Sequence, residues 1–166
     1  MGEGTDIARR NFLRGRYEGW RERVRPPGTT AASLEACTGC GRCVDACPTH
    51  IIRLIADRPA LDFSVAECTF CGQCADLCPE PVFTGRPQSF LHVAIVGENC
   101  LARNGTDCQA CRDACPTEAI RFRPRAGGPF LPELAEEACT GCGACLAVCP
   151  VAAIGLREVT RESLHV

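Results

Sequence analysis

Residues 37–48 read CTGCGRCVDACP, so four cysteines follow the spacing C-x2-C-x2-C-x3-C and a proline comes directly after the fourth. The same spacing returns at residues 68–79 and 139–150, and the run at residues 100–116 differs in a wider first gap. All sixteen cysteines fall into these runs. They are Cys37, Cys40, Cys43 and Cys47; Cys68, Cys71, Cys74 and Cys78; Cys100, Cys108, Cys111 and Cys115; and Cys139, Cys142, Cys145 and Cys149.

This spacing is typical of the thiolate ligands of a ferredoxin 4Fe-4S cluster. Soft sulfur ligands suit iron-sulfur clusters, and the fourth cysteine of such a run usually ligates the neighbouring cluster. Four thiolates per cluster predict four 4Fe-4S clusters, with all sixteen cysteines as metal ligands and cofactor-binding residues.

Two other uses of cysteine fit the pattern less well. A disulfide framework belongs to small secreted chains, and the sequence has no apolar segment of signal-peptide or membrane-spanning length. Zinc sites use isolated C-x2-C pairs that close a tetrahedron, whereas three cysteines at successive spacings of three wrap a loop around a larger group. We therefore expect iron-sulfur clusters, and no membrane span.

The composition predicts a fold that depends on its metal. The hydrophobic fraction of 46% counts all sixteen cysteines, and the aromatic residues are seven Phe, one Trp and one Tyr in 166 residues. Little apolar core remains once the cysteines are set aside, so ligand binding has to supply much of the folding free energy.

The charge is spread unevenly over the chain. The formal net charge is -2, and residues 1–28 hold seven arginines against four acidic residues, which gives this arm +3 and the rest -5. No broad basic face interleaved with aromatic residues is present, and we do not expect nucleic-acid binding.

An internal repeat predicts the architecture. Segment 37–52 matches segment 139–154 at nine of sixteen positions, which indicates duplication of one cluster-binding unit. Apolar or alternating stretches at residues 51–56, 119–123 and 153–157 are expected to be strands, with hairpin turns at residues 57–59 and 126–129. We predict an α+β fold of two tandem bacterial-type two-cluster ferredoxin modules, residues 29–96 and 97–166, after a basic N-terminal arm, residues 1–28.

Within such a module the ligands cross over between runs. Cys37, Cys40 and Cys43 would join Cys78 at one cluster, and Cys68, Cys71 and Cys74 would join Cys47 at the other. The last two runs would pair likewise. A nested pairing, first run with fourth and second with third, stays open, although we favour the sequential one. Glycines inside the loops let backbone N–H groups approach the cluster sulfurs; they are Gly39, Gly41, Gly72, Gly141 and Gly143.

The third run is the one that departs from the pattern. Seven residues, 101–107, separate Cys100 from Cys108, and we expect them to form an exposed lobe over that cluster. A neutral loop extension is an equal alternative. A third is that Cys100 is not a ligand and that the site holds a three-iron or labile cluster, so this site is the least secure of the four.

The N-terminal arm carries two further patterns. Residues 8–14 read ARRNFLR, which is similar to the twin-arginine export consensus, but the apolar run of a signal peptide does not follow. Leu13, Tyr17 and Trp20 lie at helical spacing and would suit an amphipathic docking element. A flexible basic tail or a segment folded onto the body are the alternatives, and we expect a cytoplasmic protein.

The chain resembles the NapF family of ferredoxin-type proteins that accompany periplasmic nitrate reductases. The resemblance covers almost the whole chain and includes the Arg-Arg pair near the start, the wide third run opening CLA, and four short motifs: RPP at residues 25–27, ECTFC at 67–71, FRP at 122–124 and GCGAC at 141–145. It implies a cytoplasmic accessory protein that contacts the catalytic molybdoenzyme subunit before export and assists its maturation or cofactor loading.

Two classes of function follow for a protein with these clusters. One is an electron-transfer relay in an oxidoreductase complex with a redox partner protein, and the other is the accessory role that the resemblance implies. We do not expect an enzyme, because the sequence lacks a nucleotide-binding glycine fingerprint, a nucleophile elbow and an H-E-x-x-H pair. His50, His92 and His165 are scattered and read as surface or packing residues. Acidic residues between third and fourth cysteines are expected on the exposed sides of short helices; they are Asp45, Asp76 and Asp113.

Overall fold

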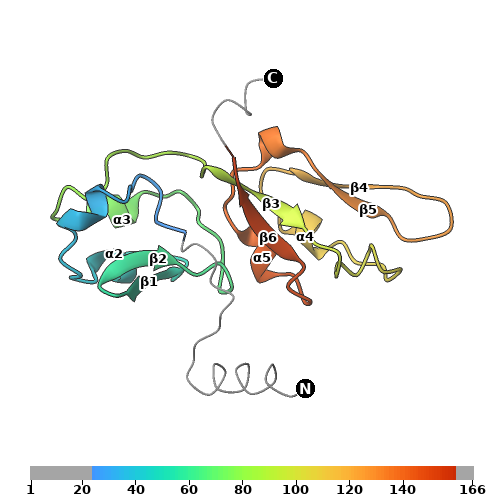
Figure 1. Cartoon of the computed structure of the whole chain (residues 1–166), viewed down its shortest axis with the longest axis horizontal. Coiled ribbons are helices and arrows are strands. Elements are labelled where there is room, and N and C mark those ends of the chain that lie inside the picture. The colour runs from blue at the N-terminus through green and yellow to red at the C-terminus, as the bar shows by residue number, and fades with distance from the viewer. Residues whose placement is uncertain (1–23, 160–166) are drawn as a thin grey trace, which may run out of the picture.

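The computed structural model describes residues 24–159 as two halves built from one-turn helices and two-stranded antiparallel sheets. Figure 1 shows β1, β2, α2 and α3 in one half and β3 to β6 with α4 and α5 in the other. This arrangement is the α+β ferredoxin-like fold that the sequence predicts. The predicted arm, residues 1–28, lies largely outside the described residues.

The four α-helices among residues 24–159 all occupy the same place in a cysteine run. They are α2 (Arg42–Asp45), α3 (Gln73–Asp76), α4 (Ala110–Asp113) and α5 (Ala144–Ala147), and each contains the third cysteine of its run. Gly41, Gly72 and Gly143 precede three of these helices with left-handed backbone, φ 80°, 77° and 88°. Glycine adopts this conformation without the Cβ clash that other residues meet, which explains its place before the helix. Two 3₁₀ turns, η1 (Ser33–Ala36) and η2 (Glu136–Ala138), lead into the first and fourth runs.

Two hairpins follow the first and third runs. β1 (Ile52–Ile55) pairs with β2 (Arg58–Leu61), and β4 (Ile120–Arg123) pairs with β5 (Leu131–Leu134). The second hairpin turns within the predicted segment. The first turn was predicted at residues 57–59 and is wrong by about two residues, because Ala56 and Asp57 form it with φ of 49° and 57°. Pro59 is therefore part of β2, in a two-stranded sheet where the proline needs no second partner strand.

A third strand pair, which the sequence analysis did not anticipate as a pair, lies in the second half. β3 (His92–Val96) runs antiparallel to β6 (Ile154–Glu158), with Ala94 opposite Leu156. β3 falls inside the range 29–96 that was predicted for the first module. The sheet of the second half therefore begins before residue 97, where the sequence-based boundary was set.

The first half has no counterpart of this pair among the described residues. Instead, the backbone N–H of Leu61 in β2 donates a 2.8 Å hydrogen bond to the carbonyl of Val24. The N–H of Asp62 donates to the carbonyl of Ile51, just before β1, at 2.7 Å. The backbone at Val24 thus lies beside β2.

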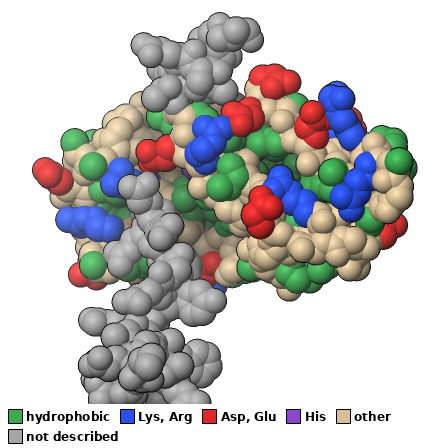
Figure 2. Space-filling model, turned by 45° about the vertical axis from the view of Figure 1, so that its right-hand side comes forward, with side chains coloured by type: hydrophobic (Ala, Val, Ile, Leu, Met, Phe, Trp, Pro, Cys, Tyr) green, Lys and Arg blue, Asp and Glu red, His purple; other side chains and the backbone are tan. Residues whose placement is uncertain are grey.

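The core consists of two small apolar clusters in which cysteines take part. One gathers Ile51, Ile52, Leu61 and Phe63 around Cys43 and Cys47, and the other gathers Ala94, Ile120 and Ile154 around Cys145. Figure 2 shows acidic and basic side chains interspersed over the face that it draws. Among residues 24–159, no helix has the length and apolar character needed to cross a bilayer.

Candidate metal centres

Four cysteines from two runs line one hollow in the first half. Cys37, Cys40 and Cys43 of the first run face Cys78, the last cysteine of the second run, across a space of about 350 Å³ that is partly open to solvent. Leu54, Pro59, Val82 and Phe83 complete its apolar wall. We call this set of four thiols the first site. Its membership is the crossed arrangement that sequential pairing of the runs predicts.

The second half contains a matching hollow. Cys139, Cys142 and Cys145 of the fourth run line about 340 Å³ of space together with Cys115, the last cysteine of the third run. Burial, together with the charges of Cys142, Cys139, Cys111 and Cys115, raises the pKa of the Cys145 thiol to about 12. These four thiols form the fourth site.

The second site consists of Cys68, Cys71 and Cys74 with Cys47. Burial raises the pKa of the Cys68 thiol to about 11, and the nearby charges of Cys47 and Cys71 add to the effect. Burial likewise raises the pKa of Cys74 to about 11, with Cys68 and Cys71 among its charged neighbours. Cys47, Cys68 and Cys74 also pack in the same apolar cluster.

The third site consists of Cys100, Cys108 and Cys111 with Cys149. Burial raises the pKa of the Cys111 thiol to about 11, and Cys100 is the charged neighbour that raises it most, followed by Cys108. Cys149, which the crossed pairing assigns to this site, packs against the same apolar cluster as Cys111. Helix α2 packs against α3, and α4 against α5. The structure thus brings the runs together sequentially and not in the nested order.

The arrangement of the thiols fits an iron-sulfur cluster. In the described residues 24–159, no three Cys, His, Asp or Glu side chains converge closely enough for a single metal ion. In the first and fourth sites the thiols instead surround an apolar hollow. Burial raises the pKa of several of these thiols, so their deprotonation is costly unless a cation replaces the proton. A cluster of soft iron atoms held by four thiolates meets that requirement.

Two threonines, which the sequence analysis missed, contact the thiols that cross between runs. Burial would raise the pKa of Cys47, but hydrogen bonds from the Thr49 hydroxyl and from backbone N–H groups outweigh it and lower the pKa. The Thr49 Oγ1 lies 3.6 Å from the Cys47 Sγ. Cys115 has the same surroundings, with the Thr117 Oγ1 at 3.7 Å and a lowered pKa. The Cys-Pro-Thr sequence, which occurs at residues 47–49 and again at 115–117, could have indicated these contacts from the sequence.

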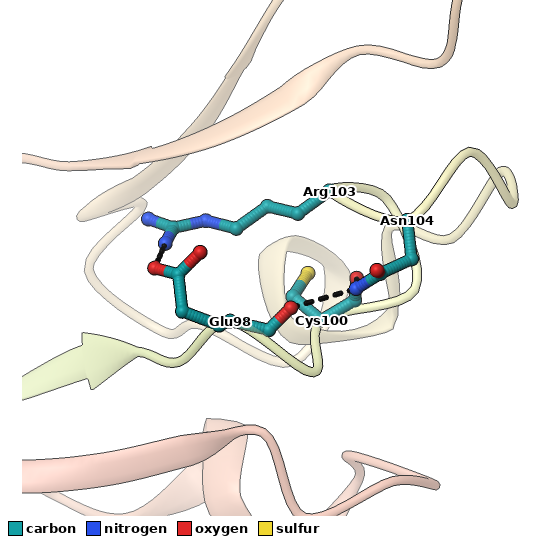
Figure 3. Close-up of polar contacts among 4 residues, drawn as sticks. All are labelled: Glu98, Cys100, Arg103 and Asn104. Carbon is teal, nitrogen blue, oxygen red and sulfur yellow. Dashed lines mark hydrogen bonds and ion pairs between the residues drawn. The ribbon is translucent and has the colours of Figure 1, made fainter.

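The inserted residues of the third run form a hydrogen-bonded lobe around Cys100. The Asn104 Nδ2 donates to the backbone carbonyls of Glu98 and Cys100, at 2.7 and 2.9 Å, and the Arg103 guanidinium pairs with the Glu98 carboxylate at 2.7 Å (Figure 3). Ala102 is fully buried beneath the lobe. The insert is exposed, as predicted, but it has a fixed internal structure that holds the backbone of Cys100 beside the other thiols.

The remaining residues singled out in the sequence lie away from the thiols or play packing roles. His50 is exposed, whereas His92 is buried, and its Nε2 lies 2.8 Å from the carbonyl of Gly141. His165 lies outside the described residues. Asp45, Asp76 and Asp113 are all exposed on their helices, as predicted; Asp76 pairs with Arg86, and Asp113 with Arg112.

Known proteins similar to this chain agree with the geometry. Residues 36–82 and 106–161 match the family model of the 4Fe-4S dicluster domain. Ferredoxin-type protein NapF of Escherichia coli (strain K12) is 39% identical over 164 residues, which cover 96% of this chain and 97% of that protein. Ferredoxin-type protein NapF of Haemophilus influenzae is 38% identical over 168 residues, 93% of this chain and 96% of that protein. Ferredoxin-type protein NapG of Escherichia coli (strain K12) is 36% identical over 152 residues, 76% and 66% of the two chains.

The family model covers the first, second and fourth cysteine runs and Cys108, Cys111 and Cys115 of the third, whereas Cys100 lies outside the matched residues. A two-cluster domain accounts for the crossed ligands of each half, and the NapF proteins match along nearly the whole chain. The chain belongs to the NapF family of ferredoxin-type iron-sulfur proteins and is built from 4Fe-4S dicluster domains.

Proposed function

We propose that the chain binds four 4Fe-4S clusters and acts in the cytoplasm as an accessory protein in the maturation of the catalytic subunit of periplasmic nitrate reductase. The observation that carries the cluster assignment is the convergence of four thiols from two runs on one hollow, seen in each half. Similarity to NapF proteins over 96% of the chain supports the accessory role. When bound, such clusters accept and donate single electrons.

The residues of the chain would set the conditions for that chemistry. Sixteen cysteines hold the metal, the Thr49 and Thr117 hydroxyls donate to ligand thiolates, and apolar side chains exclude water from the inner faces of the sites. Cys40 and Cys71 are exposed, so the first and second sites, both in the first half, each have a ligand at the surface. We propose a carrier and binding protein, not an enzyme, with the unprocessed molybdoenzyme subunit as its partner.

An electron-transfer relay is the second candidate, and one observation favours it. The two halves touch through the loops of two cysteine sites, with the Cys68 N–H donating to the Cys142 carbonyl at 2.8 Å. Such a contact is not needed for two independent cluster-binding modules that only assist assembly. It suits a protein that passes electrons along its length to a redox partner.

Capture of partners from cytoplasm under anaerobic conditions tests the proposal. Tagged intact protein and a Cys37→Ser/Cys40→Ser variant would be compared, with iron content measured on both. Retention of the unexported catalytic subunit of a periplasmic nitrate reductase by the loaded protein, and not by the variant, would support the accessory role. Capture of only a reductase or another ferredoxin would support the relay. Elemental analysis that returned zinc, or far fewer than about sixteen iron atoms per chain, would overturn the cluster assignment.

A further inference from the structure

The two halves of the chain meet where the loop of the second site faces the loop of the fourth. The backbone N–H of Cys68 donates to the carbonyl of Cys142 at 2.8 Å, and the N–H of Phe90 donates to the carbonyl of Thr140 at 2.9 Å. Both acceptors lie inside the fourth cysteine run.

A stack of aromatic rings also connects the loop of the second site with the loop of the fourth site. Phe70, inside the second run, has left-handed backbone with φ 53°, and its ring centroid lies 5.2 Å from that of Phe90. Phe90 stacks on His92 at 4.8 Å and 13° between planes, and the His92 Nε2 lies 2.8 Å from the Gly141 carbonyl in the fourth run. A bulky residue with positive φ is held there only when its surroundings compensate for the strain, and this stack provides that packing.

The first and third sites lie on the outer sides of this contact. Residues of β1 and β2 line the first site, and none of the hydrogen-bonded residues of the contact between the halves, Cys68, Phe90, Thr140 and Cys142, is among the residues that line it. The lobe of the third site reaches Arg125, beyond β4, through the Ala102 carbonyl at 3.5 Å.

We infer that the four sites lie in the order first, second, fourth, third, and that the contact between Cys68 and Cys142 is the junction at which charge crosses between the halves. The inference rests on the proposed loading of the sites with clusters. Across the junction one electron leaves one site and is taken up by the other, with no proton transfer and no bond made or broken. The order differs from the order of the runs in the sequence.

Electron paramagnetic resonance of selectively emptied proteins tests this order. One full-length variant, Cys37→Ser/Cys40→Ser with Cys108→Ser/Cys111→Ser, keeps the second and fourth sites. Its counterpart, Cys71→Ser/Cys74→Ser with Cys142→Ser/Cys145→Ser, keeps the first and third. After reduction with dithionite we expect line broadening from spin-spin interaction in the former and two independent signals in the latter. A protein with about eight iron atoms at the second and fourth sites but no interaction would overturn the inference alone, whereas a parent protein without clusters would overturn the proposed function.

A glycine pair tests the junction with every cysteine present. Gly41 and Gly143 both precede a helix with left-handed backbone, φ 80° and 88°, so alanine strains the two positions alike. A Cβ at Gly143 would overlap the buried Phe63 ring, while a Cβ at Gly41 meets nothing within 4 Å. We expect the Cys68 amide of Gly143→Ala to exchange hydrogen about tenfold faster than that of Gly41→Ala. The Leu61 amide, which bonds Val24, should exchange alike in both. Equal exchange of the Cys68 amide would contradict the inferred junction.

Discussion

Thr49 shows how one side chain alters the chemistry of a ligand thiol. Its hydroxyl lies 3.6 Å from the Cys47 Sγ and is the largest of the contacts that lower the pKa of this thiol against the effect of burial. A hydrogen bond to a thiolate stabilises the more negative state of whatever the thiolate holds. The same contact recurs between Thr117 and Cys115.

Thr49→Val should therefore lower the reduction potential of the second site. Loss of one hydrogen bond to a charged group removes about 1 kcal/mol of preference for the reduced state, which corresponds to roughly 40 mV for a one-electron couple. Potentiometric titration followed by electron paramagnetic resonance measures the shift. Thr84→Val is the control, because its hydroxyl donates to the Gly28 carbonyl at 3.1 Å and is not bonded to sulfur. An unchanged or raised potential in Thr49→Val would contradict the argument.

His50 illustrates a second residue-scale effect, which lies in the backbone. His50, Glu118 and Ala152 stand three residues after the fourth cysteine of their runs and have φ of 52°, 52° and 47°. The N–H of His50 donates to the Cys47 carbonyl at 3.0 Å, which closes the turn after Pro48. The turn directs the next backbone N–H groups toward the Cys47 sulfur, and left-handed strain accompanies it.

His50→Gly should raise the free energy of unfolding by about 0.5–1 kcal/mol, because glycine relieves the strain at positive φ. Ala46→Gly is a matched control in the same run. Ala46 has ordinary helical backbone, φ -74°, and this change should lower the free energy of unfolding by about 0.5–1 kcal/mol. Anaerobic guanidinium unfolding followed by far-UV circular dichroism compares the two. Opposite signs are expected, and destabilisation by both would show that strain at His50 is unimportant.

At the scale of elements, the inserted lobe shapes the loop of the third run, as glycines shape the loops of the other runs. Gly39 and Gly41 let the first loop turn tightly, whereas the third run bridges from Cys100 to Cys108 with a longer path fixed by side chains. The Asn104 side chain adds two hydrogen bonds to backbone carbonyls to the backbone hydrogen bonds within the lobe. The lobe keeps Cys100 beside Cys111, and we therefore keep Cys100 among the proposed ligands of the third site.

Asn104→Ala should free the Cys100 backbone and make the third site labile. Two lost hydrogen bonds to backbone carbonyls cost about 1–2 kcal/mol, enough for roughly tenfold faster iron loss on exposure to air. Iron content and the signal of a three-iron cluster, followed over time, report the loss. Asn99→Ala removes a comparable 2.8 Å hydrogen bond, to the Val151 carbonyl, and leaves the lobe intact. Equal iron loss from both variants would contradict a specific role for the lobe.

Local elements could be predicted from the sequence, and their partners only in part. Cysteine spacing with the following proline predicted each short helix, because a one-turn helix depends on a few neighbouring residues, whereas the crossing of Cys47 and Cys78 was expected from the two-cluster ferredoxin module. The pairing of β3 with β6 was not anticipated, since the two strands are separated by more than fifty residues and both are short. The sequence also left the nested pairing of the runs open, because the pairing depends on how helices from different runs pack, which no single run encodes. The hydroxyl of Thr49 was overlooked because its contact follows from the turn geometry.

For the whole molecule, the thin core makes the fold depend on the metal. Each sheet has two strands and each α-helix a single turn, and such elements are marginal by themselves. Large side chains buried almost completely are few among the described residues: Ile51, Ile120, Val82, Val93 and Pro26. The thiols stand in both apolar clusters, where a metal would join segments that have little else in common.

Removal of the metal should therefore unfold the chain. After anaerobic chelation under mild reducing conditions we expect loss of the far-UV circular dichroism signal and of cooperative melting, because the binding free energy is available only to the folded state. Addition of iron and sulfide should restore the signal, which distinguishes unfolding from chemical damage. An apoprotein with native-like circular dichroism and a cooperative melting transition would contradict this expectation.

The link between Cys68 and Cys142 is made by main-chain atoms alone. Substitution of either side chain, or of a neighbour whose change keeps the loops in place, leaves the donor N–H and the acceptor carbonyl where they are. Within this pair, only proline at position 68 would remove the N–H. Few single substitutions can therefore break this hydrogen bond between the two halves. Side chains on either side of it can be changed while the hydrogen bond is kept.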